Sequence, residues 1–93
     1  MKDLDPLLHN QLRLAIMALA GQHEEISFRF IVEKTQASRG NVSVQITKLE
    51  EAGYLEVRKT FQGRKPLTSV RITKSGQAAM QRYTDALKTY LNL

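Results

Sequence analysis

The chain has 93 residues, of which 42% are hydrophobic and 25% charged, and its formal net charge is +5. This length suits one domain over residues 1–93 with a modest core, which a second copy would enlarge. The absence of cysteine excludes a disulfide scaffold, thiol catalysis and cysteine-ligated zinc. With no signal-peptide pattern and no apolar run near the ~20 residues of a membrane span, we expect a soluble, cytoplasmic protein.

The first predicted helix covers about residues 6–20. Asp5 suits its N-cap, Pro6 suits the first helical position, and Gly21 supplies the stop. Apolar residues occupy more than one face of this helix, which is typical of a helix that is buried on two sides. In so small a domain, the second side is most simply covered by another subunit.

A helix-turn-helix is predicted next. A very short strand near residues 26–28 leads into a short helix, and residues 35–37 make the turn. Ser38 is the expected N-cap of a third helix, which runs over about residues 38–52 and stops at a glycine. Within this helix one stripe is apolar and faces the core, at spacings of four and three: Val42, Ile46 and Leu49.

A basic hairpin and a final helix complete the chain. Alternating apolar and polar residues predict strands over 54–60 and 67–73, joined by the turn Phe61–Pro66. Thr73 or Ser75 then caps a helix that reaches about residue 91. Six bases and one acid lie in residues 54–76, which is the footprint of a phosphate-contacting surface but also occurs in solvated hairpins.

The predicted order is helix, short strand, helix, recognition helix, hairpin wing and helix. It is that of a winged helix-turn-helix, a mainly α fold with a small β-hairpin (α+β). Further similarity lies in Lys48-Leu-Glu-Glu-Ala-Gly-Tyr-Leu, Gly63-Arg-Lys-Pro-Leu-Thr and Ile72-Thr-Lys-Ser-Gly. Over residues 4 to about 91, the chain resembles the short, stand-alone MarR- or ArsR-type winged-helix transcriptional regulators.

The resemblance implies that the third helix enters the major groove of double-stranded DNA. It also implies that the wing, about residues 58–68, reaches the minor groove or backbone. The helix residues placed on or near DNA are Ser38, Arg39, Asn41, Ser43, Val44, Gln45, Thr47 and Lys48. Those of the wing are Arg58, Lys59, Gln62, Gly63, Arg64 and Lys65.

Specific roles follow from side-chain chemistry. Asn41 or Gln45 suits a bidentate contact with adenine and Arg39 one with guanine, each worth roughly 1–3 kcal/mol of discrimination. Hydroxyl side chains suit phosphate oxygens, which position the helix. Val44 departs from the polar or basic residue usual in similar regulators, and it either touches a thymine methyl or weakens specificity.

The terminal helices, about residues 6–20 and 74–91, are expected to form a two-fold dimer interface. Its predicted members are apolar or aromatic: Leu4, Leu7, Leu8, Tyr83, Leu87, Tyr90 and Leu91. The other aromatic residues are expected in the core or an interface. We therefore expect a homodimeric, DNA-binding repressor without enzyme activity, cofactor or metal; a small-molecule effector stays unidentified. The alternative is a winged helix that binds a protein partner without specific DNA binding.

Overall fold

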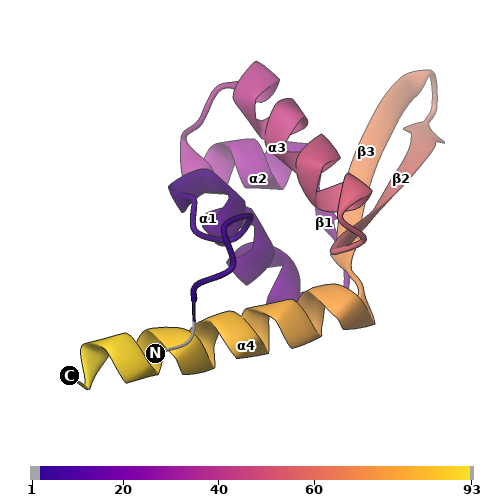
Figure 1. Cartoon of the computed structure of the whole chain (residues 1–93). Helices are drawn as coiled ribbons and strands as arrows, with labels where there is room; N and C mark the ends of the chain where they lie inside the picture. The colour runs from indigo at the N-terminus through magenta and orange to yellow at the C-terminus, as the bar shows by residue number, and fades with distance from the viewer. Residues whose placement is uncertain (1–2, 93) are drawn as a thin grey trace.

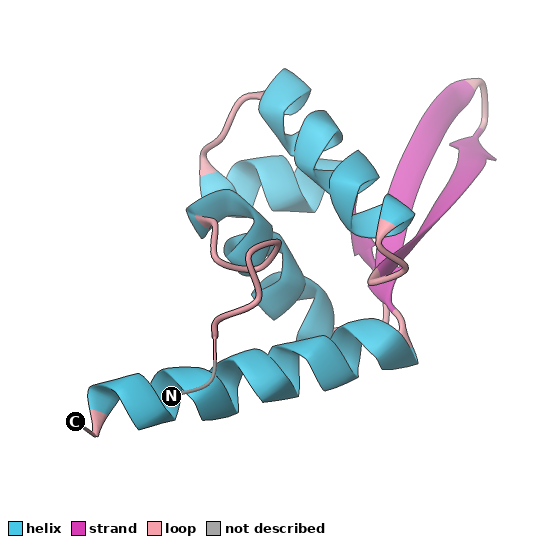
Figure 2. Cartoon of the chain, viewed as in Figure 1, coloured by secondary structure: helices cyan, strands magenta, loops and turns pink. Residues whose placement is uncertain are grey.

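The computed structural model of the protein describes residues 3–92, so residues 1, 2 and 93 of the predicted domain lie outside this range. Its elements are α1 (Gln11–Gly21), β1 (Ile26–Ser27), α2 (Phe28–Thr35), α3 (Arg39–Glu51), β2 (Leu55–Gln62), β3 (Lys65–Ile72) and α4 (Lys74–Leu91). Figure 1 shows α1, α2 and α3 packed together, the β2–β3 hairpin projecting beside α3, and α4 running along the base. The predicted order of elements is confirmed, and Figure 2 shows the mainly helical body with its single hairpin.

The three strands form an antiparallel sheet in the order β1-β3-β2. Gln62 pairs with Lys65, so the turn contains only Gly63 and Arg64, and the predicted longer turn over Phe61–Pro66 is wrong. The positive φ of Gly63, 65°, suits such a two-residue turn. Pro66 is tolerated inside β3 because β1 pairs with that strand only near its other end, which leaves an open edge here.

The first helix begins later than predicted. Asn10, with extended backbone, is its N-cap, and the Asn10 side chain accepts a hydrogen bond from the Arg13 amide at 2.9 Å. Asp5 closes a separate turn instead: its carboxylate accepts from the Leu7 amide at 2.9 Å and its carbonyl from the His9 amide at 2.8 Å. The sequence therefore holds two good caps in succession, and the second begins the helix.

The core lies between the four helices and the sheet. The predicted stripe of α3 is confirmed, because the side chains of Val42, Ile46 and Leu49 are buried. Leu8 and Tyr83, both predicted at a dimer interface, also lie in this core, with 0% and 6% of their surface exposed. An apolar stripe looks the same in sequence whether its own chain or a partner covers it, which is why these two positions were misassigned.

The start of α4 is fixed against the end of α3. Thr73, rather than Ser75, is the N-cap: its hydroxyl accepts from the Gly76 amide at 2.9 Å and donates to the Gly53 carbonyl at 2.6 Å. The Thr73 amide also donates to the Tyr54 carbonyl at 3.1 Å. Gly76 lies so close to that carbonyl that a side-chain carbon would overlap it. These contacts hold the end of α3 and the start of α4 together as one rigid corner, made by Gly53, Tyr54, Thr73 and Gly76.

Tyr54 joins the N-terminal turn to the same corner. Its hydroxyl donates to the Asp5 carboxylate at 2.7 Å. This hydrogen bond, followed by burial and the negative charge of Asp5, raises the pKa of Tyr54 above its ordinary 10.0, while Arg82 opposes the shift. The contact spans 49 residues of sequence and holds the segment before α1 in place.

We expect Tyr54 to ionise at a higher pH than a free tyrosine. Because the fold favours the protonated phenol, the stabilisation is complete below pH ~10 and is lost as the pH rises through the raised pKa. The ultraviolet titration of the wild type minus that of Tyr54→Phe should isolate a phenol that ionises above its usual range. A difference curve at the ordinary tyrosine pKa would show that the bond to Asp5 is not kept in solution.

Within residues 3–92, none of the helices combines the length and the apolar character needed to cross a membrane.

Candidate nucleic-acid interface

The side of α3 that points away from the core is exposed along its length. Ser38 caps the helix as predicted, since its hydroxyl accepts from the Asn41 amide at 3.1 Å. At 3.6 residues per turn, Gly40, Val44 and Lys48 follow one another on this outward side. Val44 is 50% exposed, and no atom lies within 4 Å of where a Gly40 side-chain carbon would be. The middle of the exposed side is therefore small and apolar, with hydrogen-bonding groups along its edges.

A chain of hydrogen bonds runs along the edge of α3 nearest α1. The Arg13 guanidinium donates to the Gln45 side-chain oxygen at 2.6 Å, and the Gln45 amide nitrogen donates to the Asn41 side-chain oxygen at 2.8 Å. Arg13 also donates to the Leu7 carbonyl at 2.6 Å. The two amides predicted to read bases are thus connected to each other and oriented by a residue of α1. Arg13 is a site residue that the sequence did not reveal, because its partner lies 32 residues away.

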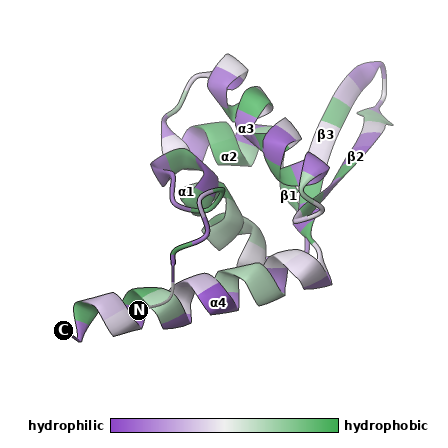
Figure 3. Ribbon diagram, viewed as in Figure 1, coloured by the Kyte–Doolittle hydropathy of each residue, from purple (hydrophilic) through white to green (hydrophobic). Residues whose placement is uncertain are grey.

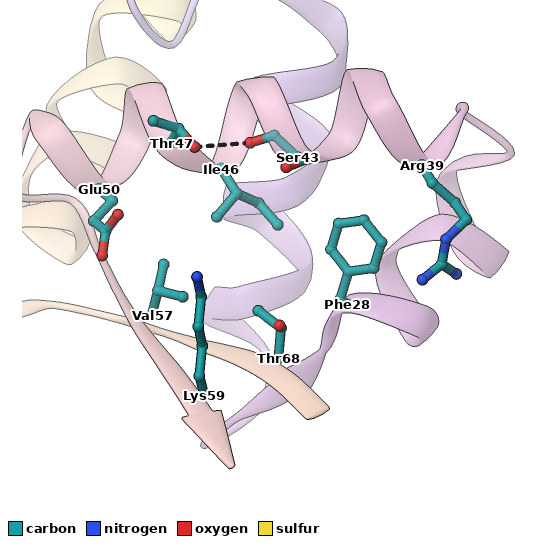
Figure 4. Close-up of a pocket in the computed structure, with 9 residues that line it drawn as sticks. All are labelled: Phe28, Arg39, Ser43, Ile46, Thr47, Glu50, Val57, Lys59 and Thr68. Carbon is teal, nitrogen blue, oxygen red and sulfur yellow. Dashed lines mark hydrogen bonds between the residues drawn. The ribbon is translucent and has the colours of Figure 1, made fainter. Parts of the chain in front are cut away.

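A cleft of about 270 Å³ separates the other edge of α3 from the sheet. Figure 4 shows the residues around it, which come from α2, α3, β2 and β3: Phe28, Arg39, Ser43, Ile46, Thr47, Glu50, Val57, Lys59 and Thr68. The Arg39 guanidinium carbon lies 5.0 Å from the centre of the Phe28 ring, within the range of a cation–π contact. The phenyl ring therefore supports Arg39 at the start of the recognition helix.

Two hydroxyl side chains on this edge were predicted to bind phosphate. The Thr47 hydroxyl donates to the Ser43 carbonyl of its own helix at 3.0 Å. Phosphate oxygens only accept hydrogen bonds, so Thr47 would have to release that carbonyl before donating to one. No hydrogen bond of the Ser43 hydroxyl is found among residues 3–92, which makes it the better phosphate donor of the two.

The positive charges of the wing divide into two groups. At its base, Arg58 lies 2.8 Å from the Glu25 carboxylate and Arg71 3.6 Å from that of Glu24. Arg58, which was predicted to contact DNA, is thus paired with Glu25, a contact that the sequence did not predict. Toward the tip, the part of the chain that the structure describes offers no ion-pair partner to its three bases, Lys59, Arg64 and Lys65. Gln62 and Gly63 lie beside these bases, so the basic surface is concentrated at the tip.

Phe61 lies outside the core. It was expected in the core or an interface, and 74% of its surface is exposed near the hairpin turn, which excludes the core. The strands reach two residues further than predicted on either side of the turn, and this extension carries Phe61 beyond the cover of α3. Figure 3 shows the end of β2 nearest the turn in the hydrophobic colour.

Known proteins resemble this chain in both sequence and fold. Residues 12–91 match the family described as winged helix DNA-binding domain. The chain is 30% identical, over 77 residues, to an uncharacterised protein from Methanocaldococcus jannaschii, a match covering 83% of this chain and 84% of that protein. A transcriptional regulator homologue from Pyrococcus horikoshii has a TM-score of 0.86 and 29% identity, over 92% of this chain and 85% of its own.

PadR from Bacillus subtilis, solved in complex with operator DNA, has a TM-score of 0.69 and 25% identity over 84% of this chain. This chain covers 47% of PadR, about half its length. MarR- or ArsR-type membership stays a prediction. The family match runs from the second residue of α1 to the last residue of α4. The chain therefore belongs to the family of winged helix DNA-binding domains.

Proposed function

We propose that the protein is a homodimeric transcriptional repressor that binds a specific sequence of double-stranded DNA. The observation that carries this proposal is the position of the wing-tip bases beside the exposed, hydrogen-bonding side of α3. In this arrangement, α3 enters the major groove, which is wide enough for a helix, and the wing reaches the neighbouring minor groove or backbone. PadR, a structural neighbour solved in complex with operator DNA, supports the binding of duplex DNA by this fold.

Base discrimination then comes from the edges of α3. Arg39, supported by the Phe28 ring, reads guanine, and the connected Asn41–Gln45 pair reads adenine. Val44, at the middle of the exposed side, contacts a thymine methyl. The wing supplies affinity that depends little on sequence, because phosphate contacts position a protein without identifying bases.

The end of α4 is the proposed dimer interface. Tyr90 and Leu91 are 39% and 76% exposed there, and Leu87 is half-buried one turn earlier. Figure 1 shows this end of α4 extending past the helical body, next to the described start of the chain, where Leu4 and Leu7 are half-buried. Two copies joined here would present two recognition helices to half-sites about 34–36 Å apart. A dimer bound over a promoter excludes polymerase, which is the basis of the proposed repressor role.

A selection from a random duplex library at near-physiological salt tests this function. We expect enrichment of an inverted repeat with half-sites about one helical turn apart, roughly 10–10.5 base pairs. Arg39→Ala should change the base preferred at one position of each half-site. Arg29→Ala is the matched control, because Arg29 lies on α2, pairs with Glu33 at 3.2 Å and should leave the selected sequence unchanged.

The other outcomes separate the parts of the proposal. Enrichment of a single half-site would support sequence-specific DNA binding and would contradict the proposed dimer. Salt-sensitive binding without any enrichment would indicate an architectural protein. An absence of duplex binding would remove the function altogether and favour a winged helix that binds a protein partner.

A further inference from the structure

The exposed phenyl ring of Phe61 has a defined place on the wing. Cross-strand pairing puts Phe61 opposite Pro66 and puts Lys59 opposite Thr68, two residues nearer the base. Residues two apart on a strand share a face, so these four side chains lie on one side of the hairpin. Figure 4 shows Lys59 and Thr68 on the side that faces α3. Phe61 and Pro66 continue that side toward the tip.

The chemistry around the ring limits what it can bind. An exposed aromatic residue on a projecting hairpin is accessible to a ligand, and 74% of the surface of Phe61 is exposed. Lys59 lies on the same side of the hairpin as the ring, Arg64 lies in the turn and Lys65 directly after it, and none of them has an acidic partner among residues 3–92. Glu24 and Glu25 lie at the base of the wing against arginines, and Glu50, which lines the same cleft as Lys59, forms no ion pair among the described residues. A ligand for the tip must therefore combine dense negative charge with an apolar surface.

The minor groove of duplex DNA has both properties. Phosphates line its edges, and the stacked bases inside it can be separated by apolar side chains such as phenylalanine, which enter between base pairs and bend the duplex. A two-stranded hairpin with a two-residue turn presents a narrow leading edge. Arg64, in that turn, suits the negative potential of the groove.

We propose that Phe61 is an apolar wedge that enters the minor groove and partly unstacks a base step. Pro66, directly opposite in β3, restricts the backbone behind the ring and helps to hold its direction. Flexible pyrimidine–purine steps such as TA are the preferred sites, because they cost the least to open. This inference rests on the proposed duplex binding, and it adds a contribution to specificity that requires no hydrogen bond to a base.

The test uses the selected duplex with 2-aminopurine in place of each adenine in turn. Unstacking raises the fluorescence of this base analogue, so the wild type should brighten one position under the wing, and Phe61→Ala should abolish that signal. We expect Phe61→Ala to weaken binding about tenfold, the scale of one base–aromatic contact. The dependence of affinity on salt should stay unchanged, because the ring releases no counterions.

Leu67→Ala is the matched control. Leu67 is also exposed, at 41%, but it pairs with Thr60 and so lies on the opposite side of the same hairpin. The Leu67→Ala variant should keep the 2-aminopurine fluorescence signal. Phe61→Leu, which retains an apolar side chain, should keep part of it. Circular dichroism should show that all three variants have the wild-type fold, since neither position is buried.

Each result has a distinct meaning. If the wild type binds the duplex but Phe61→Ala brightens 2-aminopurine equally well, the wedge is wrong and the proposed function stands. If Phe61→Ala instead changes the sedimentation of the protein without DNA and leaves the fluorescence intact, the ring serves contact with a second copy and the wedge is again wrong. If the wild type binds no duplex, the wedge and the function fail together.

Discussion

Gly76→Ala should destabilise the fold by about 1–3 kcal/mol, although alanine is the better helix former. A side-chain carbon at this position would overlap the Tyr54 carbonyl oxygen and lie 2.9 Å from the Ile72 Cγ1 atom. The carbonyl cannot move away freely, because it accepts a hydrogen bond from the Thr73 amide at 3.1 Å. Relief of the overlap would loosen the corner that positions α3 against α4.

Chemical denaturation of the purified variant measures this effect. Gly40→Ala is the matched control, since Gly40 also lies in the first turn of a helix but its added carbon would meet nothing within 4 Å. This control should gain up to ~1 kcal/mol from helix propensity. Equal stability changes in the two variants would mean that the close approach at Gly76 does not exist in solution.

Arg64→Ala combined with Lys65→Ala should weaken binding to all duplex sequences and flatten its dependence on salt. Each lost phosphate contact reduces the slope of log affinity against log salt by about one, so the double variant should lose about two. The preferred sequence should stay the same, because in the proposed complex these side chains are attracted by the negative potential of the backbone and minor groove and read no base edge. Fluorescence anisotropy over a series of salt concentrations measures both quantities.

Arg58→Ala combined with Arg71→Ala is the charge-matched control. It also removes two positive charges from the wing, but from its base, where Glu25 and Glu24 lie 2.8 and 3.6 Å away. We expect a much smaller change in slope, because those guanidinium groups already face carboxylates. Equal slopes for the two double variants would show that net charge alone, rather than the tip, governs DNA binding.

Local sequence rules predicted the recognition helix in detail. Ser38 and the spacing of Val42, Ile46 and Leu49 are interpretable without knowledge of the fold, since a cap and a stripe depend on neighbours within a few residues. The start of α1 was less determined. Asp5 and Asn10 both satisfy the chemistry of a cap, and the choice between them has no signature in the neighbouring residues; in the structure Asn10 caps the helix and Leu8, between them, is buried.

The rest of the candidate site depends on contacts between distant residues. Arg13 is an isolated base in an apolar helix until the fold brings it against Gln45. Likewise, the sequence placed Phe61 in a turn, and only the longer pairing of β2 with β3 shows which side of the hairpin it occupies. The acidic neighbours of the wing base, Glu24 and Glu25, come from a loop that precedes β1. None of these relations has a signature within a short window of sequence.

The hydrogen bond between Arg13 and Gln45 also bears on how such a protein can acquire a new target. Replacing Gln45 to address a different base would leave the half-buried Arg13 guanidinium with only the Leu7 carbonyl as its partner, and a loss of stability would accompany the change in preference. We therefore expect positions 13 and 45 to change together. Transferring only the residues of α3 from one regulator to another would move the base-contacting side chains without Arg13, the residue of α1 that orients Gln45.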